Sequence, residues 1–340
     1  MTKNAYLTRS LGTDPLTVET LPSALRCDPT PLDAVYIRNN RGAVDRQGPW
    51  TIEIAGTTRP GILVLSDIYG PLPGVELTAV LQCAGNGRRR LPETAPGVQW
   101  DLGGMACVDW SGVRVTDVVA ACGGRAGAPS YLTTLGGDGT ADDPARVERS
   151  VPLAAAMADA ILADRLNGEP IPDIHGGPVR LVMPGYYAVN SVKWVRRLAL
   201  TDTETDAAIQ AVRYRMVPPG EEPSPRHPSA WAMKPVAMIL EAAPLGEGWA
   251  VAGVAFGDGG AIESVGLSVD GSTWVPAELG PALGPFGWRR FRGVVGKRDG
   301  APWVAARCAT GEGVQPRHTA PSIDGYAIDG WEDLAHRLQP

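Results

Sequence analysis

Short apolar runs separated by turns fill the sequence after residue 235. The runs cover residues 250–256, 262–269, 274–279, 288–295 and 303–308. Glycine-containing turns at residues 257–260 and 270–271 separate the first three runs. Consecutive short strands joined by tight turns are typical of a β-sandwich. We therefore expect an all-β domain over residues 235–330, followed by a C-terminal tail at residues 331–340.

The preceding part of the chain has a mixed pattern. Short apolar runs alternate with turns from residue 31 to residue 200, and the expected helices, from Thr116 to Gly124 and from about Ser150, are brief. The pair Asn167-Gly168 predicts a hairpin, because both central residues of its turn need positive φ. With 42 glycines and 31 prolines, the chain favours turns over long helices. These features predict an α+β domain over residues 31–200.

Two further segments complete the expected organisation. Residues 201–234 are rich in Pro, Glu, Arg and Thr and have weak periodicity, which is typical of a connecting segment. Residues 1–30 are interpreted as an N-terminal extension. A length of 340 residues is sufficient for two packed domains.

Charge and cysteine usage limit the partners and the compartment. The net charge of −6 gives no chain-wide attraction for nucleic acid or for anionic membranes, so an anion site would need a local basic cluster. The sequence has no apolar stretch of membrane-spanning length and no signal-peptide pattern. Five cysteines without CxxC spacing suit a reducing compartment. We predict a cytoplasmic protein, with the periplasm as the alternative if an export signal was removed.

The most informative motif is Leu-Gln-Cys-Ala-Gly-Asn-Gly-Arg at residues 81–88, followed by Arg89 and Arg90. Small and turn-forming neighbours let the sulfur of Cys83 project into a cleft, and nearby arginines favour its thiolate. A thiolate is a suitable ligand for a soft or borderline metal. The alternative, which composition alone favours, is a buried cysteine followed by a solvated basic run.

The segment Gln-Cys-Ala-Gly-Asn followed by arginine resembles the molybdenum-ligating motif of the sulfite oxidase family. Further resemblances lie, in the family's order, at residues 36–40, 150–153, 167–172, 175–180, 184–185, 191–194 and 268–274. The resemblance implies a sulfite-oxidase-type molybdopterin-binding domain followed by an immunoglobulin-like dimerisation domain. It also implies that Cys83 is the protein ligand of a molybdenum held by molybdopterin.

The resemblance assigns site residues. It implies that the cofactor is bound by Arg38, Asn39, Cys83, Asp138, His175, Arg180, Ser191 and Lys193. It implies that the substrate is bound by Arg38, Arg88, Trp100, Tyr214 and Arg289, with Arg290 as the alternative to Arg289. Without the matched motifs, these residues have plainer interpretations: a loop histidine, a solvated lysine, an exposed turn aspartate and a tryptophan of the core.

Three positions depart from the family pattern. Asn40 replaces a histidine, Gly87 replaces an arginine, and Asn190 replaces an arginine. Each change lowers the positive charge available to a cofactor or an oxyanion. The result is a different oxyanion, a weaker grip on the substrate, or compensation by Arg89 and Arg90.

The implied activity is the oxidation of sulfite to sulfate by oxo transfer. The sequence has no CxxCH haem-attachment motif. We therefore expect electrons to pass to an external one-electron acceptor, with a cytochrome c as one candidate. We also expect a homodimer, with Trp274, Phe286 and Trp303 available for an interface or for the sandwich core. The alternatives are a nitrate or sulfoxide reductase of the same superfamily and a metal-free binding module.

Overall fold

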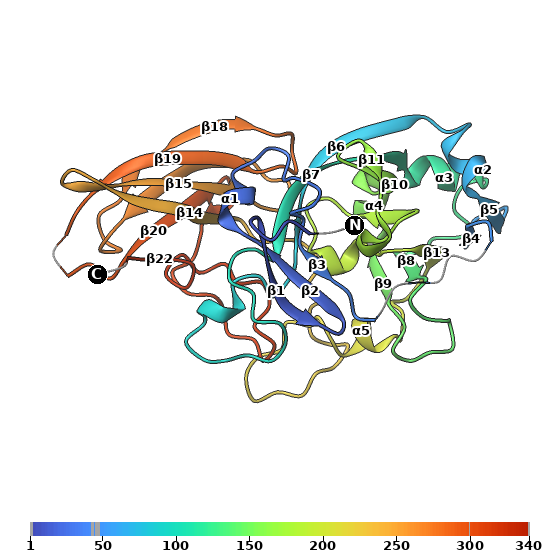
Figure 1. Ribbon diagram of the computed structural model, residues 1–340. Coiled ribbons are helices and arrows are strands. Elements are labelled where there is room, and N and C mark those ends of the chain that lie inside the picture. Colours follow the sequence, from blue (N-terminus) through green and yellow to red (C-terminus); the bar gives the residue numbers. More distant parts are fainter. Residues whose placement is uncertain (1–2, 42–43, 45–47, 299, 339–340) are drawn as a thin grey trace.

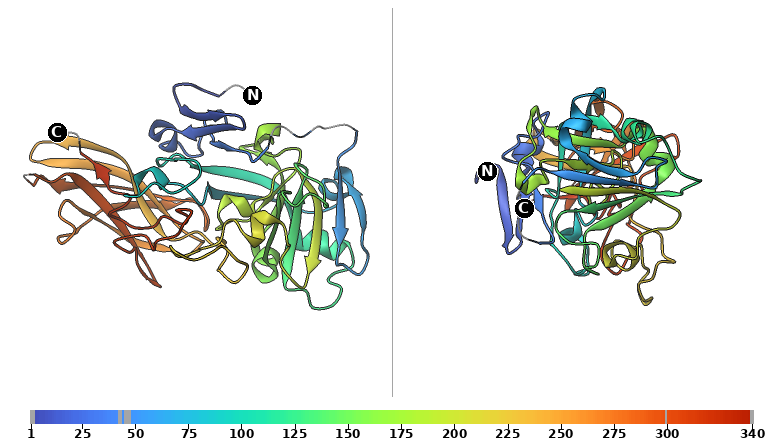
Figure 2. Two further views of the ribbon diagram at one scale, coloured as in Figure 1. Left: turned by 90° about the horizontal axis from the view of Figure 1, so that it is seen from below. Right: turned by 90° about the vertical axis from the view of Figure 1, so that its right-hand side faces the viewer.

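The computed structural model describes residues 3–41, 44, 48–298 and 300–338. It has a mixed α/β lobe and a β-sandwich lobe, with a small N-terminal sheet lying along their junction (Figures 1 and 2). No helix among these residues is long and apolar enough to cross a membrane. The α+β domain and the all-β domain expected from the sequence are both confirmed.

The N-terminal sheet has the order β1-β2-β3. Its strands are β1 (Thr8–Thr13), β2 (Leu16–Thr20) and β3 (Ile37–Arg38), and helix α1 (Pro22–Leu25) follows β2. Much of the segment expected to be an extension is therefore paired with a strand that carries Arg38. The buried carboxylate of Glu19 accepts hydrogen bonds from the backbone N–H groups of Asp101 (2.7 Å) and Gly103 (3.1 Å). The hairpin thus holds a loop of the mixed lobe.

Two five-stranded sheets form the mixed lobe. The first has the order β11-β10-β7-β6, with β12 also paired to β10: β6 (Gly74–Gln82), β7 (Met105–Arg114), β10 (Ile161–Leu166), β11 (Glu169–Pro170) and β12 (Arg180–Val182). The second has the order β5-β4-β13-β8-β9: β4 (Thr51–Ala55), β5 (Gly61–Val64), β8 (Tyr131–Gly136), β9 (Glu148–Pro152) and β13 (Val195–Thr201). Only β4 and β13 pair in parallel among these strands.

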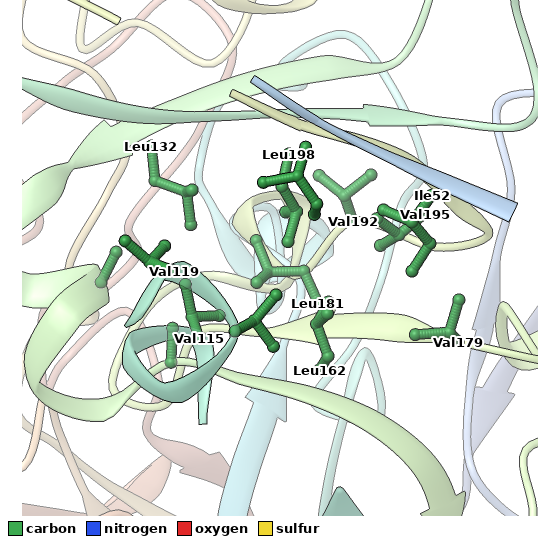
Figure 3. Packing of buried hydrophobic residues seen from close by; sticks show 14 of the residues in the cluster. Ile52, Val115, Val119, Leu132, Leu162, Val179, Leu181, Val192, Val195 and Leu198 are labelled. Carbon is green, nitrogen blue, oxygen red and sulfur yellow. The ribbon is translucent and has the colours of Figure 1, made fainter. Parts of the chain in front are cut away.

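Short helices and apolar strand faces close the core of this lobe. The helices are α2 (Leu65–Tyr69), α3 (Val115–Ala121), α4 (Leu153–Asp159) and α5 (Ala208–Ala211). Val115 and Val119, one turn apart on α3, pack with Leu132, Leu162 and Leu198 of the two sheets (Figure 3). The expected helices therefore exist, and α4 begins directly after Pro152. Asn167 (φ 51°) and Gly168 (φ 79°) form the predicted hairpin turn between β10 and β11.

The second lobe is a sandwich of two sheets. One sheet has the order β14-β15-β19-β18: β14 (Val236–Leu245), β15 (Gly248–Phe256), β18 (Glu278–Ala282) and β19 (Arg289–Gly296). The other has the order β17-β16-β20-β21: β16 (Ile262–Ser268), β17 (Val275–Pro276), β20 (Trp303–Thr310) and β21 (Gly313–Val314). Val265 and Leu267 of β16 lie beside Cys308 and Ala306 of β20 on the inner face of this sheet, because alternate residues of a strand point to the same face, and they pack with Val251 and Phe291 of the other sheet.

The end of the chain is integrated into both lobes. Strand β22 (His336–Arg337) pairs with β20. Trp331 lies edge-on to Trp274 and Trp303, with ring centres 5.0 Å and 6.0 Å away. The Phe286 side chain packs against a buried cluster of the mixed lobe that includes Ala79 and Leu81. All three expected interface aromatics thus have partners within the chain.

Candidate active site

Cys83 lies directly after the end of β6, in a tight loop. Its N–H donates to the Gly104 carbonyl (2.8 Å), and the side-chain oxygen of Asn86 accepts the N–H of Gly104 (2.8 Å). The chain then turns at Gly87, whose φ is 88°, into the 3-10 helix Arg88–Arg90. A Cβ at Gly85 would lie 2.3 Å from the Arg88 guanidinium. The small residues of the motif therefore allow Arg88 to fold back beside a half-buried thiol.

A cleft with about 690 Å³ of empty space is lined by Cys83. Its polar lining residues include Arg38, Asn39, Asn40, Cys83, Asp138, Arg180, Ser191, Lys193 and Tyr214. We call it the cofactor-side cleft. Seven of the eight residues that the resemblance assigns to the cofactor line it.

A second cleft with about 720 Å³ of empty space is also lined by Cys83. Its lining includes Arg38, Arg88, Trp100, Arg213, Tyr214, Asp324 and Tyr326. We call it the substrate-side cleft. Arg38, Asn40, Cys83, Ile209 and Tyr214 line both clefts. The thiol therefore lies where the two clefts meet.

Buried cations form one wall of the cofactor-side cleft. Arg180 donates to the carbonyls of Ser191 and His175 (both 3.1 Å), and burial lowers its pKa to about 10. Lys193 donates to the Ile174 carbonyl (3.0 Å) and to the side-chain oxygen of Asn39. Burial, with Arg180 and Arg38 nearby, holds the pKa of Lys193 well below its ordinary value. Such a wall favours an anionic ligand, which would restore the charged lysine.

Asp138 supplies an acceptor in the same cleft. Its Oδ1 is buried and has no hydrogen-bond partner among the described residues. Desolvation raises the pKa of this carboxyl group, although Lys193 and Arg41 oppose the shift. A buried acceptor without a partner costs free energy, so it indicates a place for a ligand N–H donor.

His175 lies behind the cleft rather than in its lining. The ring is buried, its Nε2 lies 2.9 Å from Nζ of Lys3, and its pKa is far below the ordinary value because of burial and the neighbouring Lys3 and Lys193. Its carbonyl holds Arg180. The structure therefore gives His175 an indirect role, through the position of Arg180.

Arginines dominate the substrate-side cleft. Arg88 donates from Nε to the Asp324 carbonyl (2.9 Å) and from Nη1 to the Val98 carbonyl (2.7 Å). Trp100 is fully buried, lies edge-on to Tyr36 at 5.7 Å, and contributes to the wall. Arg213 joins Arg38 and Arg88 in the lining. No sequence motif indicated Arg213, although this residue directly precedes the expected Tyr214.

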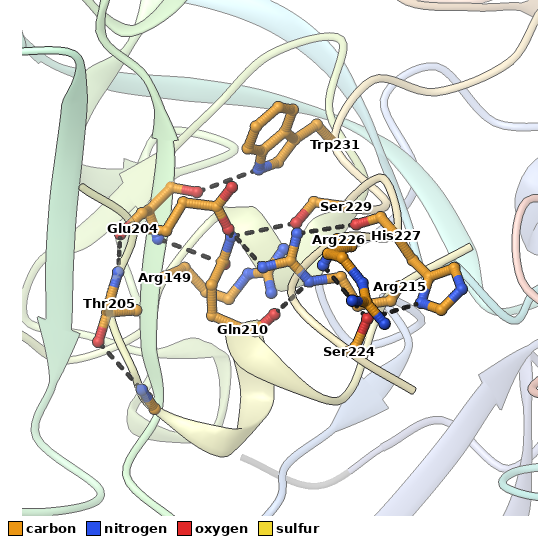
Figure 4. A network of polar contacts seen from close by, with 12 residues as sticks. Arg149, Glu204, Thr205, Gln210, Arg215, Ser224, Arg226, His227, Ser229 and Trp231 are labelled. Carbon is orange, nitrogen blue, oxygen red and sulfur yellow. Dashed lines mark hydrogen bonds and ion pairs between the residues drawn. The ribbon is translucent and has the colours of Figure 1, made fainter. Parts of the chain in front are cut away.

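Tyr214 is held by the segment that sequence analysis interpreted as a connector. The neighbouring Arg215 is buried, forms an ion pair with Glu204, and donates to the carbonyls of Gln210 (2.7 Å) and His227 (3.0 Å). Figure 4 shows this network, in which the Gln210 side chain also donates to Ser229 (3.1 Å). The network fixes Tyr214 at φ 51° in the lining of both clefts.

The expectation that Arg289 returns to the cleft is not met. Arg289 begins β19 and donates to the carbonyls of Gly280 (2.9 Å) and Ile262 (2.8 Å), all within the sandwich. The alternative, Arg290, forms an ion pair with Asp28. Neither arginine is in the lining of either cleft. The alternation of strand residues and their pairing with β15 and β18 direct both side chains elsewhere.

The structure gives a local reason for two of the three departures from the family pattern, those at Asn190 and Gly87. Asn190 is buried and accepts a hydrogen bond from Arg149 (2.9 Å), a fully buried arginine of β9 whose pKa falls to about 9 through desolvation. A Cβ at Gly87 would lie 3.0 Å from Leu334 in a left-handed backbone conformation. Arg89 and Arg90 line a different cleft, so they do not compensate for the missing cations.

Comparisons with known proteins agree with this geometry. Residues 41–209 match the oxidoreductase molybdopterin binding domain. Mitochondrial sulfite oxidase of Mus musculus is 31% identical over 271 residues, which cover 72% of this chain and 48% of that protein. The chain belongs to the sulfite oxidase family of molybdopterin-dependent oxidoreductases. The cofactor of this family is molybdenum bound by molybdopterin.

Nitrate reductases are as similar to this chain in sequence as the sulfite oxidase is. A nitrate reductase (NAD(P)H) of Hordeum vulgare is 33% identical over 223 residues, which cover 62% of this chain and 25% of that protein. The chain thus spans between a quarter and a half of the length of these curated relatives. The fold matches the sulfane dehydrogenase SoxCD of Paracoccus pantotrophus with a TM-score of 0.79 at 24% identity, covering 99% of this chain and 90% of that one.

The cofactor-side cleft fits the family's cofactor in chemical terms. Molybdopterin carries a phosphate, which suits the buried Arg180 and Lys193, and ring N–H groups, which suit the unpartnered oxygen of Asp138. Cys83, which lines both clefts, offers a thiol to the metal. The same residues are therefore consistent with a molybdopterin site.

Proposed function

We propose that this protein oxidises sulfite to sulfate and passes the electrons to an external one-electron acceptor, for which a cytochrome c is one candidate. The observation that supports this most is the position of Cys83 between a cationic cofactor-side cleft and an arginine-lined second cleft. When bound, the cofactor supplies oxygen-atom transfer and accepts two electrons. Sulfite and water then become sulfate, two protons and two electrons.

The chain's own contribution is binding and orientation. Arg38, Arg88 and Arg213 attract and hold a small dianion beside Cys83, since forked guanidinium donors suit oxyanions. The guanidinium of Arg88 is already oriented by two backbone carbonyls, so little freedom is lost when the anion binds. Tyr214 places a phenol group beside the thiol, from which it can donate a hydrogen bond to the substrate.

Nitrate reduction is the second candidate, because barley nitrate reductases are as similar in sequence as sulfite oxidase. Arg289 does not bear on the choice between sulfite and nitrate, since it lies in the sandwich. The lining of the substrate-side cleft contains three arginines and one carboxylate, that of Asp324. This excess of positive charge favours a doubly charged anion over the singly charged nitrate.

Steady-state kinetics on the purified holoenzyme distinguish these activities. Sulfite is supplied with ferricyanide, and nitrate is supplied in parallel with reduced methyl viologen, after molybdenum has been measured. We expect sulfite-dependent reduction of ferricyanide, with two ferricyanide ions reduced for each sulfite. Nitrate turnover without sulfite oxidation would contradict the proposal, and a correctly folded protein without molybdenum would support a metal-free binding module.

A further inference from the structure

The chain returns to the substrate-side cleft after leaving the sandwich. Within residues 322–328, the N–H of Ala327 donates to the Ala84 carbonyl (2.8 Å), and the Asp324 carbonyl accepts from Arg88 Nε (2.9 Å). Ala84 and Arg88 belong to the loop that begins with Cys83. The segment, which we call the return segment, therefore lies directly against this loop and contributes Asp324 and Tyr326 to the cleft lining.

Tyr326 lies within a stack of four side chains. Its ring is nearly parallel to that of Tyr214, with an interplanar angle of 12° and a centre-to-centre distance of 4.9 Å. The guanidinium carbon of Arg88 lies 5.4 Å from the centre of the Tyr326 ring, and that of Arg149 lies 5.8 Å from the centre of the Tyr214 ring. Both contacts have the geometry of cation–π interactions. We call this series the arginine–tyrosine column.

The column leaves one end of Arg88 available to a ligand. Nε and Nη1 of Arg88 donate to backbone carbonyls, whereas Nη2 has no hydrogen-bond partner among the described residues. The guanidinium is planar, so two fixed nitrogens and an aromatic neighbour determine where Nη2 points. Tyr214 is similarly constrained by the ring of Tyr326.

We propose that Tyr326 is a positioning residue for the oxyanion: its ring holds Arg88 and Tyr214 in the orientation that binds the substrate beside Cys83. The ring performs this role through stacking and not through its hydroxyl group. The hydrogen bond from the Tyr326 N–H to Oγ of Ser322 (3.1 Å) fixes the backbone that carries the ring. This inference rests on the proposed function only in taking the second cleft as the oxyanion site.

The test compares holoenzyme variants with the wild type. Tyr326→Leu removes the ring, Tyr326→Phe retains it, and Ser322→Ala loosens the backbone with less risk to folding. Tyr131→Leu is the matched control, because Tyr131 pairs with Trp231 (6.4 Å) outside both clefts. The readouts are the dissociation constant of inorganic sulfate by calorimetry, KM and kcat for sulfite, and molybdenum content.

We expect Tyr326→Leu to raise the sulfate dissociation constant and KM about tenfold, the scale of one aromatic and one cation–π contact, with kcat within about threefold. Tyr326→Phe and Tyr131→Leu should stay near wild type, and Ser322→Ala should be intermediate. If Tyr326→Leu does not fold, an unchanged Ser322→Ala enzyme overturns the inference.

Several outcomes separate this inference from the proposed function. If the enzyme oxidises sulfite and Tyr326→Leu leaves KM unchanged, only the inference about Tyr326 is overturned. Sulfate binding that weakens in Tyr326→Leu, in an enzyme that does not oxidise sulfite, overturns the proposed function alone. If Tyr326→Phe binds sulfate as weakly as Tyr326→Leu does, the role of the ring is overturned. A wild type that neither binds sulfate nor oxidises sulfite overturns both.

Discussion

Arg88 and Arg289 are both arginines that hydrogen-bond to backbone carbonyls, yet only Arg88 lines a cleft. We predict that Arg88→Met raises KM for sulfite about 10- to 100-fold with a smaller fall in kcat, because it removes a charge-assisted contact of ~1.5–3 kcal/mol. Arg289→Met should leave KM unchanged and lower the free energy of unfolding. Steady-state kinetics and urea titration measure the two effects. Equal KM values for both variants would refute the assignment of Arg88 to the substrate.

We predict that cofactor binding is coupled to the protonation of Lys193. Its pKa in the cofactor-free chain is well below the ordinary value of 10.5 because of burial and the nearby Arg180. An anionic cofactor favours the charged lysine, so binding should take up a proton between the lowered pKa and the ordinary one, and affinity should fall as pH rises through that window. Calorimetry in buffers of different ionisation enthalpy measures this uptake. Lys193→Met should abolish it, and proton release by the wild type would contradict the prediction.

Sequence could identify site residues only where they lie in contiguous motifs. Cys83, Arg180 and Lys193 belong to such motifs and line the cofactor-side cleft. Tyr326 lies 243 positions after Cys83 in the chain, and its place depends on the path of the return segment through the completed fold. The prediction that Arg289 lines the substrate-side cleft was wrong for a different reason. Arg289 does lie in a matched motif, but a motif does not determine the direction in which a strand side chain points.

At the scale of elements, the N-terminal hairpin supports the substrate-side cleft through Glu19. We predict that Glu19→Ala lowers the free energy of unfolding by about 2–4 kcal/mol, because the N–H groups of Asp101 and Gly103 lose their acceptor. Arg9→Met is the matched control: it removes the partly exposed cation of the ion pair but leaves both backbone hydrogen bonds to Glu19, so it should cost less than Glu19→Ala. Chemical denaturation checks both values. A Glu19→Ala variant as stable as Arg9→Met would refute the supporting role.

Local patterns predicted the regular elements well and the irregular ones poorly. The Asn167-Gly168 turn, α3 and the sandwich strands follow from local turn chemistry and from the spacing of apolar residues. Residues 201–234 lack such spacing, yet polar contacts tie them to β9 of the mixed lobe: Arg149 donates to the Ile209 carbonyl (2.7 Å), and the Trp231 side chain donates to the Ser150 carbonyl (3.0 Å). Those contacts leave no periodic signal in the sequence.

For the whole molecule, we propose a symmetric homodimer formed through the sandwich. Trp274, Trp303 and Phe286 do not support it, since their rings pack against other parts of the chain. Val294 of the sandwich is 56% exposed beside a groove and is the better interface candidate. Light scattering should give twice the mass of the chain for the wild type and for Ile62→Glu, a change in the other lobe, but a monomer for Val294→Glu. A monomeric wild type at micromolar concentration would refute the dimer.

The ligation of the metal by Cys83 tests the whole account most directly. Mo K-edge X-ray absorption should be measured on the wild type and on Cys83→Ser, together with sulfite turnover. We predict that the serine variant folds, loses one sulfur neighbour of molybdenum and loses turnover, because a hydroxyl is a harder and far less acidic ligand than a thiol. Unchanged sulfur coordination with turnover near that of the wild type would contradict the account.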